Sequence, residues 1–274
     1  MGPSRRGVDG HRRFRVLSLD LWFTTLYYRS PDEERWRAAR TRILRELVKP
    51  RTGGTYSAAE ISEAIHAVRH GGERAGHPPD QVGPLQVVQS IARRLGGELT
   101  APPEAAAARY SAAGLDEDPP QLNPEVVTLA AALPDVPLIA ITNTGRLGST
   151  WETAIVSWGG PRFQHIITSC EVGRGKPDRA IFDEAVRRLG VPAAEILHVG
   201  DRWDLDIEGA LGAGFGAALY GGLWDLYPAG TYADPNGHFG GHDPKRLGPE
   251  VLYLEHLAEL LEGDRFARST GPHA

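Results

Sequence analysis

The stretch 195-EILHVGDRWDLDIEGALGAGFGAALYG-221 contains a strand, a helix and a second strand in one run, and it decides the fold class. Residues 195–200 are rich in Ile, Leu and Val without alternation, as in a strand whose two faces are both buried. Residues 204–213 have helical spacing, and 216–221 form a second apolar run. A strand, helix and strand in succession form the repeating unit of a parallel sheet.

The same pattern recurs along the chain. Three further apolar runs are predicted as buried strands, namely 14-FRVLSL-19, 137-PLIAIT-142 and 164-QHIITS-169. Helical patterns occupy about 123–133 and 178–189, and 251–263 is expected to form a short strand and a closing helix. Alternation of strand and helix predicts an α/β fold with a doubly wound parallel sheet of Rossmann type. In that fold ligands bind beyond the carboxyl ends of the strands.

The segment from about residue 28 to residue 121 shows no convincing strand and is predicted to be an all-helical insert. Residues 32–48 have helical spacing, and Ser57-Ala-Ala-Glu60 forms a capping box that begins a second helix. Two more helices are expected at 82–95 and 103–113. Because the insert follows the first strand directly, it is placed to cover the carboxyl ends of the sheet. The predicted domains are a flexible basic arm at 1–13, an α/β core at 14–27 and 122–263, a helical cap domain at 28–121, and a tail at 264–274.

Composition and charge exclude several classes of function. The net charge of −5 gives no electrostatic case for nucleic-acid binding. No apolar run approaches the roughly 18–20 residues that span a bilayer, and the N-terminus lacks the apolar stretch of a secretory signal. Cys170 is the only cysteine, so no intrachain disulfide can form. We therefore expect a cytoplasmic protein without membrane attachment, and the sequence is compatible with a homodimer.

Polar residues follow four of the predicted strands and would meet at one edge of the sheet. They are Asp20 and Thr24 after the first strand, Thr142-Asn143 at the second, Lys176 ahead of the helix that follows the third, and Asp201 and Asp206 after the fourth. Each alone has an ordinary explanation, because an aspartate at a strand end often caps a helix and a lysine ahead of a helix start can be merely solvated. Their occurrence together, each after its own strand, indicates one site.

Two segments carry a family resemblance. Residues 169-SCEVGRGKPDRAIFDEAVRRLG-190 and 198-HVGDRWDLDIEGALGAGF-215 resemble the third and fourth motifs of the haloacid dehalogenase-like superfamily almost residue for residue. The resemblance covers nearly the whole chain, and the helical insert lies where that family carries its helical cap. It implies a hydrolase that acts on a small phosphorylated molecule with Mg²⁺ as its cofactor.

The resemblance also implies which residues hold the metal. Asp20 would be the nucleophile that forms an aspartyl-phosphate, and it would share the Mg²⁺ ion with Asp201. The family also uses the backbone carbonyl two residues after the nucleophile, which here belongs to Trp22. Asp206 would support the metal directly or through water.

The remaining residues would act on the phosphoryl group. A phosphoryl group in transfer carries charge on several oxygens, so its site must supply cations and hydrogen-bond donors. By the same resemblance, Thr142 and the backbone near Asn143 would donate to those oxygens, with Thr24 beside them on the substrate. Lys176 would neutralise Asp20 and the transferring group.

Trp22 departs from the family pattern. Phosphatases of the family usually have a second aspartate there, which protonates the leaving oxygen and later activates water, a contribution of about 10²–10⁴-fold. An indole ring does neither, and Phe23 replaces the glycine that often follows. The first hypothesis is therefore a Mg²⁺-dependent phosphohydrolase or phosphotransferase whose substrate has a good leaving group, such as an acyl phosphate, an anhydride or an aryl phosphate. Alternatively the proton comes from the cap, or from the loop containing Asp225, His238 and His242.

Two further hypotheses remain open at this point. The aromatic residue at position 22 is similar to the tyrosine of the family's 2-haloacid dehalogenases, but those enzymes need no metal and lack the acidic fourth motif, whereas Asp201 and Asp206 are present here. In the third hypothesis the fold serves as a binding module or in a specialised biosynthetic step. Substrate identity would depend on the insert, where Arg35, Arg37, Arg40 and Arg42 mostly form a solvated face although one of them could reach an anionic substrate.

Overall fold

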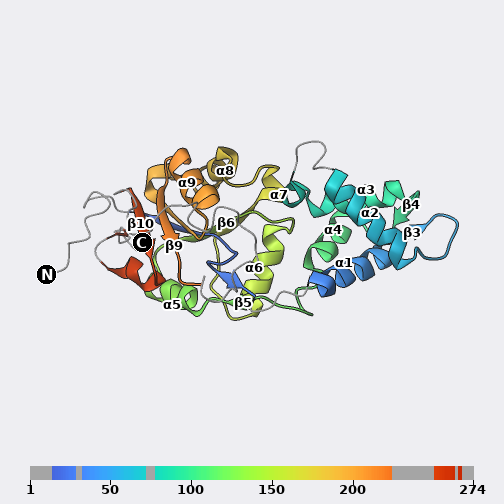
Figure 1. Ribbon diagram of the computed structural model, residues 1–274, viewed down its shortest axis with the longest axis horizontal. Coiled ribbons are helices and arrows are strands. Elements are labelled where there is room, and N and C mark those ends of the chain that lie inside the picture. The colour runs from blue at the N-terminus through green and yellow to red at the C-terminus, as the bar shows by residue number, and fades with distance from the viewer. Residues whose placement is uncertain (1–13, 29–32, 72–77, 224–249, 263–264, 267–274) are drawn as a thin grey trace, which may run out of the picture.

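A computed structural model describes residues 14–28, 33–71, 78–223, 250–262 and 265–266 (Figure 1). Its core is a six-stranded sheet in the order β10-β9-β8-β1-β6-β7. The strands are β1 (Val16–Leu19), β6 (Leu138–Thr142), β7 (His165–Thr168), β8 (Ile196–Gly200), β9 (Gly216–Tyr220) and β10 (Val251–Leu254). Every pairing in this sheet is parallel, so all six carboxyl ends lie at one edge. The predicted α/β fold class is confirmed.

Parts of the sequence-based prediction lie outside the described residues. They include the basic arm at 1–13, residues 224–249 with the loop that contains Asp225, His238 and His242, and most of the tail. Within the described part of the chain, no helix combines the length and the apolar character needed to cross a bilayer.

Helices cover both faces of the sheet, which gives three layers (Figure 1). One face carries α5 (Pro124–Ala132), α6 (Gly148–Ser157) and the 3₁₀ helix η7 (Leu257–Leu261), and the other carries α8 (Arg179–Leu189) and α9 (Glu208–Ala213). Successive residues of β1 serve opposite faces, because Leu17 packs in one buried cluster with Trp151 of α6 while Val16 packs in another with Phe182 of α8. Burial on both faces explains the absence of alternation in the strands.

The core helices differ in which side chain caps their first N–H groups. Asn123 Oδ1 accepts a hydrogen bond from Glu125 N at 3.0 Å and caps α5, and the Asp178 side chain caps α8 in the same way through Ala180 N. Helix α6 was not predicted, because it has no capping side chain of its own. Its first N–H, from Gly148, donates instead to Glu171 Oε2 at 2.9 Å, a contact from 23 residues away.

The segment between the first strand and α5 forms a helical insert. Its helices are α1 (Glu33–Leu47), α2 (Ala58–Gly71), the 3₁₀ helix η2 (Pro79–Gln81), α3 (Pro84–Arg94) and α4 (Pro103–Ala112). The predicted capping box is present, since Ser57 N donates to Glu60 Oε2 at 2.8 Å and Glu60 N donates to Ser57 Oγ at 3.2 Å. The insert has its own buried cluster, which includes Leu44, Ile61 and Ile91.

The expectation that residues 28–121 contain no strand was wrong. Strands β3 (Val48–Pro50) and β4 (Gly97–Leu99) form an antiparallel pair at the far end of the insert. Three residues are too few to show a strand period in the sequence. The close approach of β3 to β4 requires a glycine at position 97, because an added Cβ there would lie 2.7 Å from the Lys49 carbonyl oxygen.

A second short pair of strands joins the insert to the core. Strand β2 (Leu26–Tyr27) leads into the insert, and β5 (Gln121–Leu122) leads out of it. The two pair antiparallel, with Leu26 opposite Leu122. The chain therefore enters and leaves the insert at one place. We propose that the two domain boundaries predicted near residues 28 and 121 lie at this pair.

The buried side chain of Asn123 ties three segments of the core together. Besides capping α5, its Nδ2 donates to the Thr24 carbonyl at 2.8 Å and to the Tyr220 hydroxyl at 3.1 Å. We expect Asn123→Ala to lower the free energy of unfolding by about 2–4 kcal/mol, because a cap is lost and buried polar groups are left unpaired. Urea denaturation measures the change. The exposed cap variant Ser57→Ala should cost only about 1 kcal/mol, and equal losses in the two variants would contradict the interpretation.

Candidate active site

Three buried carboxylates meet at the carboxyl edge of the sheet. Asp20 follows β1, Asp201 follows the neighbouring strand β8, and Asp206 lies in the π-helical turn Trp203–Ile207 that precedes α9. One oxygen of each carboxylate lies within 4.8 Å of an oxygen of the other two. The parallel register of β1 and β8 therefore brings together acids that are more than 180 residues apart in the chain.

Lys176 lies between two of these carboxylates. Its Nζ is 2.9 Å from Asp20 Oδ1 and also donates to Asp206 Oδ1, and the Lys176 side chain is almost completely buried. The side chain of Asn143 fixes the lysine backbone from both sides, since Oδ1 accepts from Lys176 N at 2.7 Å and Nδ2 donates to Lys176 O at 2.9 Å. Asn143 thus uses its side chain to position Lys176, while its backbone follows the end of β6.

Asp206 is held from several directions. Its Oδ2 accepts from Arg202 N at 3.0 Å, and its Oδ1 accepts from Lys176 and from the His198 ring. The carboxylate lies directly over Gly200, where an added Cβ would be 2.2 Å from Asp206 Cγ. Burial opposes ionisation, but Lys176 and the His198 donor outweigh it and lower the pKa of Asp206. Asp206 therefore stays ionised.

Ser18 and His198 form a second layer beneath the carboxylates, which the sequence analysis missed. They are partners on adjacent strands, with Ser18 Oγ 2.9 Å from His198 Nδ1 and His198 Nε2 3.2 Å from Asp206 Oδ1. Burial lowers the pKa of His198, so the ring is neutral. Because a carboxylate only accepts, Nε2 carries the proton and Nδ1 accepts from the Ser18 hydroxyl. The signal available in the sequence was a polar residue in the middle of each otherwise apolar strand.

The charges of the cluster match a divalent cation. Burial raises the pKa of Asp20 to about 7; Lys176 opposes this rise, and the charges of Asp206 and Asp201 add to it. Counted over these four groups, one ammonium balances one of three carboxylates, so an ion of charge +2 would neutralise the set. Clustered carboxylate oxygens are also the ligands that Mg²⁺ prefers. The residues present therefore fit a magnesium site.

Two threonines among the predicted site residues have hydroxyls with unused hydrogen-bonding capacity. Thr142, the last residue of β6, and Thr24, in the loop after Asp20, are fully buried, and neither Oγ1 has a hydrogen-bond partner within the described ranges. Strand β6 is the direct neighbour of β1, so Thr142 ends beside the strand that carries Asp20. An unsatisfied buried hydroxyl is costly, which favours a ligand that accepts from it.

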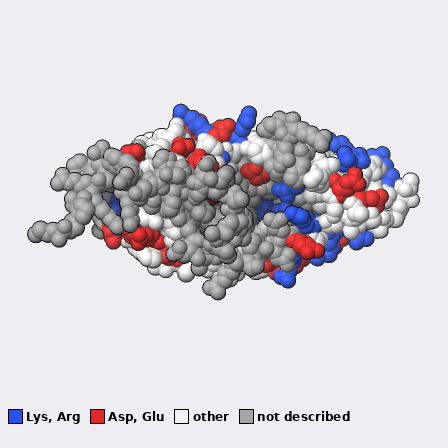
Figure 2. Space-filling view, viewed as in Figure 1, with Lys and Arg blue, Asp and Glu red and all other residues white. Residues whose placement is uncertain are grey.

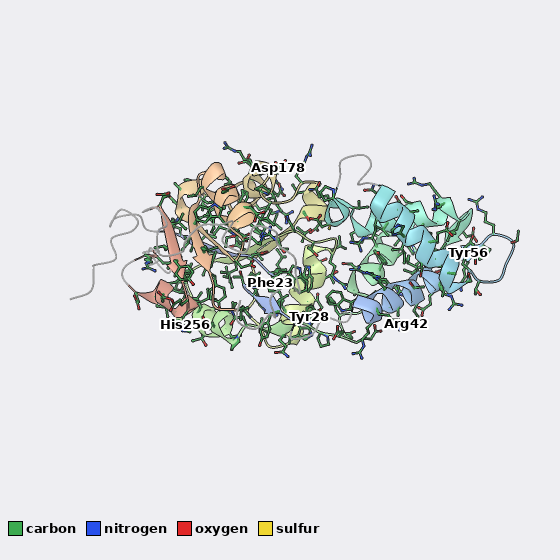
Figure 3. All side chains as sticks on the ribbon, in the orientation of Figure 1. Phe23, Tyr28, Arg42, Tyr56, Asp178 and His256 are labelled. Carbon is green, nitrogen blue, oxygen red and sulfur yellow. The ribbon has the colours of Figure 1, made fainter. Side chains whose placement is uncertain are left out.

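Trp22 contacts other aromatic rings on the side of the insert. Its indole stacks on Tyr28 with a centroid distance of 5.5 Å and meets Trp151 of α6 edge-on at 5.4 Å. Trp36 of α1 lies 6.5 Å from it and 4.8 Å from Tyr28. Figure 3 labels Tyr28 at the junction between the core and α1. We call Trp22, Tyr28, Trp36 and Trp151 the aromatic group.

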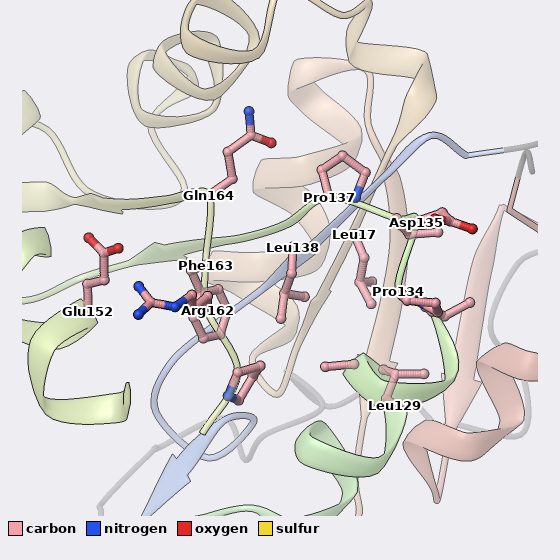
Figure 4. Close-up of a pocket in the computed structure, with 14 residues that line it drawn as sticks. Leu17, Leu129, Pro134, Asp135, Pro137, Leu138, Glu152, Arg162, Phe163 and Gln164 are labelled. Carbon is pink, nitrogen blue, oxygen red and sulfur yellow. The ribbon is translucent and has the colours of Figure 1, made fainter. Parts of the chain in front are cut away.

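A separate pocket of about 570 Å³ lies at the opposite edge of the sheet (Figure 4). Residues 134–138, which lead into the first residue of β6, and 161–164, just before β7, form much of its lining. It is therefore at the amino ends of parallel strands whose carboxyl ends carry the acids. We assign this pocket no part in the site.

The chain belongs to the haloacid dehalogenase-like hydrolase family, whose model matches residues 25–214. The matched span includes Thr142, Lys176, Asp201 and Asp206 but begins after Asp20 and Trp22. The family membership agrees with the fold and with the acidic cluster at the strand ends.

Individual relatives are similar over limited parts of the chain. The glyceraldehyde 3-phosphate phosphatase of Methanopyrus kandleri is 41% identical over 76 residues, which are 28% of this chain and 33% of that protein. The enzyme of the same name from Methanothermobacter thermautotrophicus is 36% identical over 81 residues, or 30% of this chain and 36% of its own. The matching segment thus spans about a third of these curated relatives.

Solved structures share the fold. A 2-haloacid dehalogenase of Pseudomonas syringae pv. Tomato aligns over 91% of this chain and 97% of its own, with a TM-score of 0.54 and 22% identity. A phosphatase of the family from Thermococcus onnurineus aligns over 92% of this chain and 100% of its own, with a TM-score of 0.51 and 21% identity. At this identity the likeness concerns the fold alone.

The position of Lys176 between two buried carboxylates leads to a stability prediction. We expect Lys176→Met to lower the free energy of unfolding by about 3–5 kcal/mol, because it leaves buried carboxylates without their partner charge. Urea denaturation in the presence of a chelator measures the effect. The control is Arg174→Met, whose exposed guanidinium is 3.9 Å from Asp178 and should contribute about 0–1 kcal/mol. Similar stabilities for the two variants would show that the ammonium does not hold the cluster together.

Proposed function

We propose that the protein is a Mg²⁺-dependent phosphohydrolase that removes a phosphoryl group from a small phosphorylated molecule. The observation that carries the proposal is the group of three buried carboxylates with Lys176 at the carboxyl edge of a parallel sheet. Membership of the hydrolase family supports it, as do the partial relatives named glyceraldehyde 3-phosphate phosphatase. The proposed substrate is therefore a phosphorylated small molecule.

Each residue of the site has a role in this proposal. Asp20, Asp201 and the Trp22 carbonyl would hold Mg²⁺, with Asp206 in support. When bound, the ion supplies positive charge to the phosphoryl oxygens. An Asp20 carboxylate oxygen attacks the phosphorus as the bond from phosphorus to the leaving oxygen breaks, and water then attacks the aspartyl-phosphate to release phosphate and restore Asp20.

The groups around the phosphoryl group stabilise the charge that develops on it. Lys176 Nζ already contacts Asp20 and is placed to contact an oxygen of the group bound there. The unused Thr142 hydroxyl and the backbone N–H groups that follow β6 would donate to the other oxygens. Asn143 contributes by holding Lys176 in place through both of its side-chain hydrogen bonds.

Trp22 determines the kind of leaving group that we propose. Its ring packs against Tyr28 and Trp151, and an indole N–H is far too weak an acid to protonate a leaving oxygen. The departing group must then leave without a proton from this position. An aryl phosphate, an acyl phosphate or an anhydride meets that requirement, because its leaving oxygen is stable as an anion.

Two other candidate functions can be compared with the residues of this site. A binding or biosynthetic module would keep the fold without turning over phosphate esters, and it has no physical need for three clustered acids. A 2-haloacid dehalogenase would use Asp20 without a metal, and release of halide from 2-chloropropionate in the presence of a chelator would favour it. The acidic cluster supports the phosphohydrolase over both.

The leaving-group proposal predicts a difference between aryl and alkyl esters. With Mg²⁺ present, phenyl phosphate should be hydrolysed at least about 10²-fold faster than a simple alkyl phosphate, because only the alkoxide needs a proton. Asp20→Asn should abolish both activities. Trp22→Asp should narrow the difference by restoring an acid. Phosphate release measures all three, and efficient hydrolysis of alkyl phosphates by the unaltered protein would contradict the proposal.

The metal proposal predicts Mg²⁺ binding that depends on the clustered acids. Isothermal titration calorimetry should detect binding to the unaltered protein and a loss of at least about tenfold in affinity for Asp201→Asn, because one charged oxygen ligand is removed. Asp204→Asn is the matched control, since Asp204 lies in the same segment but is exposed and pairs with Arg202. Equal affinities for the two variants, or no binding to the unaltered protein, would overturn the metal site.

A further inference from the structure

Two arginines lie where the core meets the insert, and Arg146 is buried while Arg40 is half-buried. Arg146 follows β6 by four residues, and its guanidinium donates to the carbonyls of Ser111 and Ala113 at the end of α4, the latter at 3.0 Å. Arg40 is on α1, one turn after Trp36. Burial lowers the pKa of Arg146 to about 9, and the charge of nearby Arg40 adds to this effect. Arg146 is therefore a poorly hydrated cation, fixed between the core and α4 by its bonds to Ser111 and Ala113.

These cations have few anionic partners in the described part of the chain. No carboxylate there forms an ion pair with Arg40 or Arg146. Arg40 Nε is inaccessible to solvent and has no hydrogen-bond partner there, and the same holds for the nearby Tyr110 hydroxyl. Burying an unpaired charge and an unsatisfied donor is costly, which indicates an anion as the missing partner.

The aromatic group connects the arginines to the acidic cluster. Trp22 is two residues from Asp20 and contacts both Tyr28 and Trp151. Arg146 Cζ lies 5.8 Å from the centre of the Trp151 ring. Arg40 is one turn after Trp36 on α1, and the Trp36 ring is 4.8 Å from that of Tyr28. Figure 2 shows Lys and Arg side chains gathered where the surface is hollowed between the core and the insert. A ligand on the aromatic group would thus have carboxylates at one end and arginines at the other.

We propose that Arg40 and Arg146 bind a second oxyanion of the substrate, so that the substrate is a phosphate ester with an apolar or flat middle and a carboxylate or second phosphate at its far end. The inference rests on the proposed function, because it takes the phosphoryl end to lie at Asp20. Arg40 supplies an unused donor on the insert, and Arg146 supplies a cation fixed to both the core and α4. The aromatic group contacts the part of the substrate between the two anionic ends.

Stability provides a first test that does not depend on activity. If the Arg40 guanidinium binds a ligand and has no partner in the free protein, Arg40→Met removes only an unpaired charge. The thermal midpoint of this variant without ligand should then be no lower than that of the unaltered protein. Arg42→Met, which loses an exposed ion pair with Glu117, is the control on the same helix. A clear fall in the midpoint of Arg40→Met below that of Arg42→Met would show that Arg40 is structural, and would overturn the inference.

Binding of stable phosphonates provides the decisive test. In calorimetry with Mg²⁺, 4-carboxybenzylphosphonate should bind about 10- to 100-fold more tightly than benzylphosphonate, as expected for one or two charged hydrogen bonds. Arg40→Met should remove the difference and Arg42→Met should keep it. 1,4-Xylylene bisphosphonate tests whether the far group is a second phosphate, and preference for either ligand with a second oxyanion over benzylphosphonate supports the inference.

The outcomes separate the inference from the function on which it rests. If benzylphosphonate binds with Mg²⁺ and neither second oxyanion adds affinity, the arginine site is overturned while the phosphohydrolase proposal stands. If the added affinity survives in Arg40→Met, Arg40 is not the partner and the inference fails. If no phosphonate binds to the unaltered protein, both proposals are overturned.

Discussion

Lys176 is the group on which the rest of the site depends, because its ammonium lies between the buried carboxylates of Asp20 and Asp206. Charges buried this deeply are stable only when their partners are held in place. Asn143 fixes the lysine backbone, and His198 and Arg202 N hold Asp206 from the other side. The segments that follow the strands on either side of β1, together with His198 of β8, thus supply the contacts that hold Lys176 and Asp206 beside the nucleophile candidate.

The sequence predicted the core sheet because its strands are apolar runs, four of which are followed by polar residues, and the parallel register then brings those polar ends together. It did not predict α6, whose first N–H is capped by Glu171 from α7 (Ser169–Val172) rather than by a neighbour. Nor did it predict the Ser18–His198 pair, since its two members are joined only across adjacent strands. What the sequence missed was in each case a contact between residues distant in the chain.

The aromatic group gives the residue two positions after the candidate nucleophile a packing role. The Trp22 indole cannot act as an acid or base. Its ring instead contacts Tyr28, Trp36 and Trp151, and so links the loop after β1 to helices α1 and α6. Such a contact makes the placement of the insert part of the site itself. Sequence alone could mark position 22 as unusual, but only the packing shows that the indole is directed to the insert.

The opposite charges at the two ends of the site also impose an order on binding. A phosphate ester carries two negative charges near neutral pH, and three carboxylates would repel it unless a cation is already present. The arginines beyond the aromatic group exert the opposite field, and they attract an anion whether or not a metal is bound. The proposed substrate would therefore be captured at its far end, while its phosphoryl end settles beside Asp20 only when Mg²⁺ and Lys176 together offset the carboxylates.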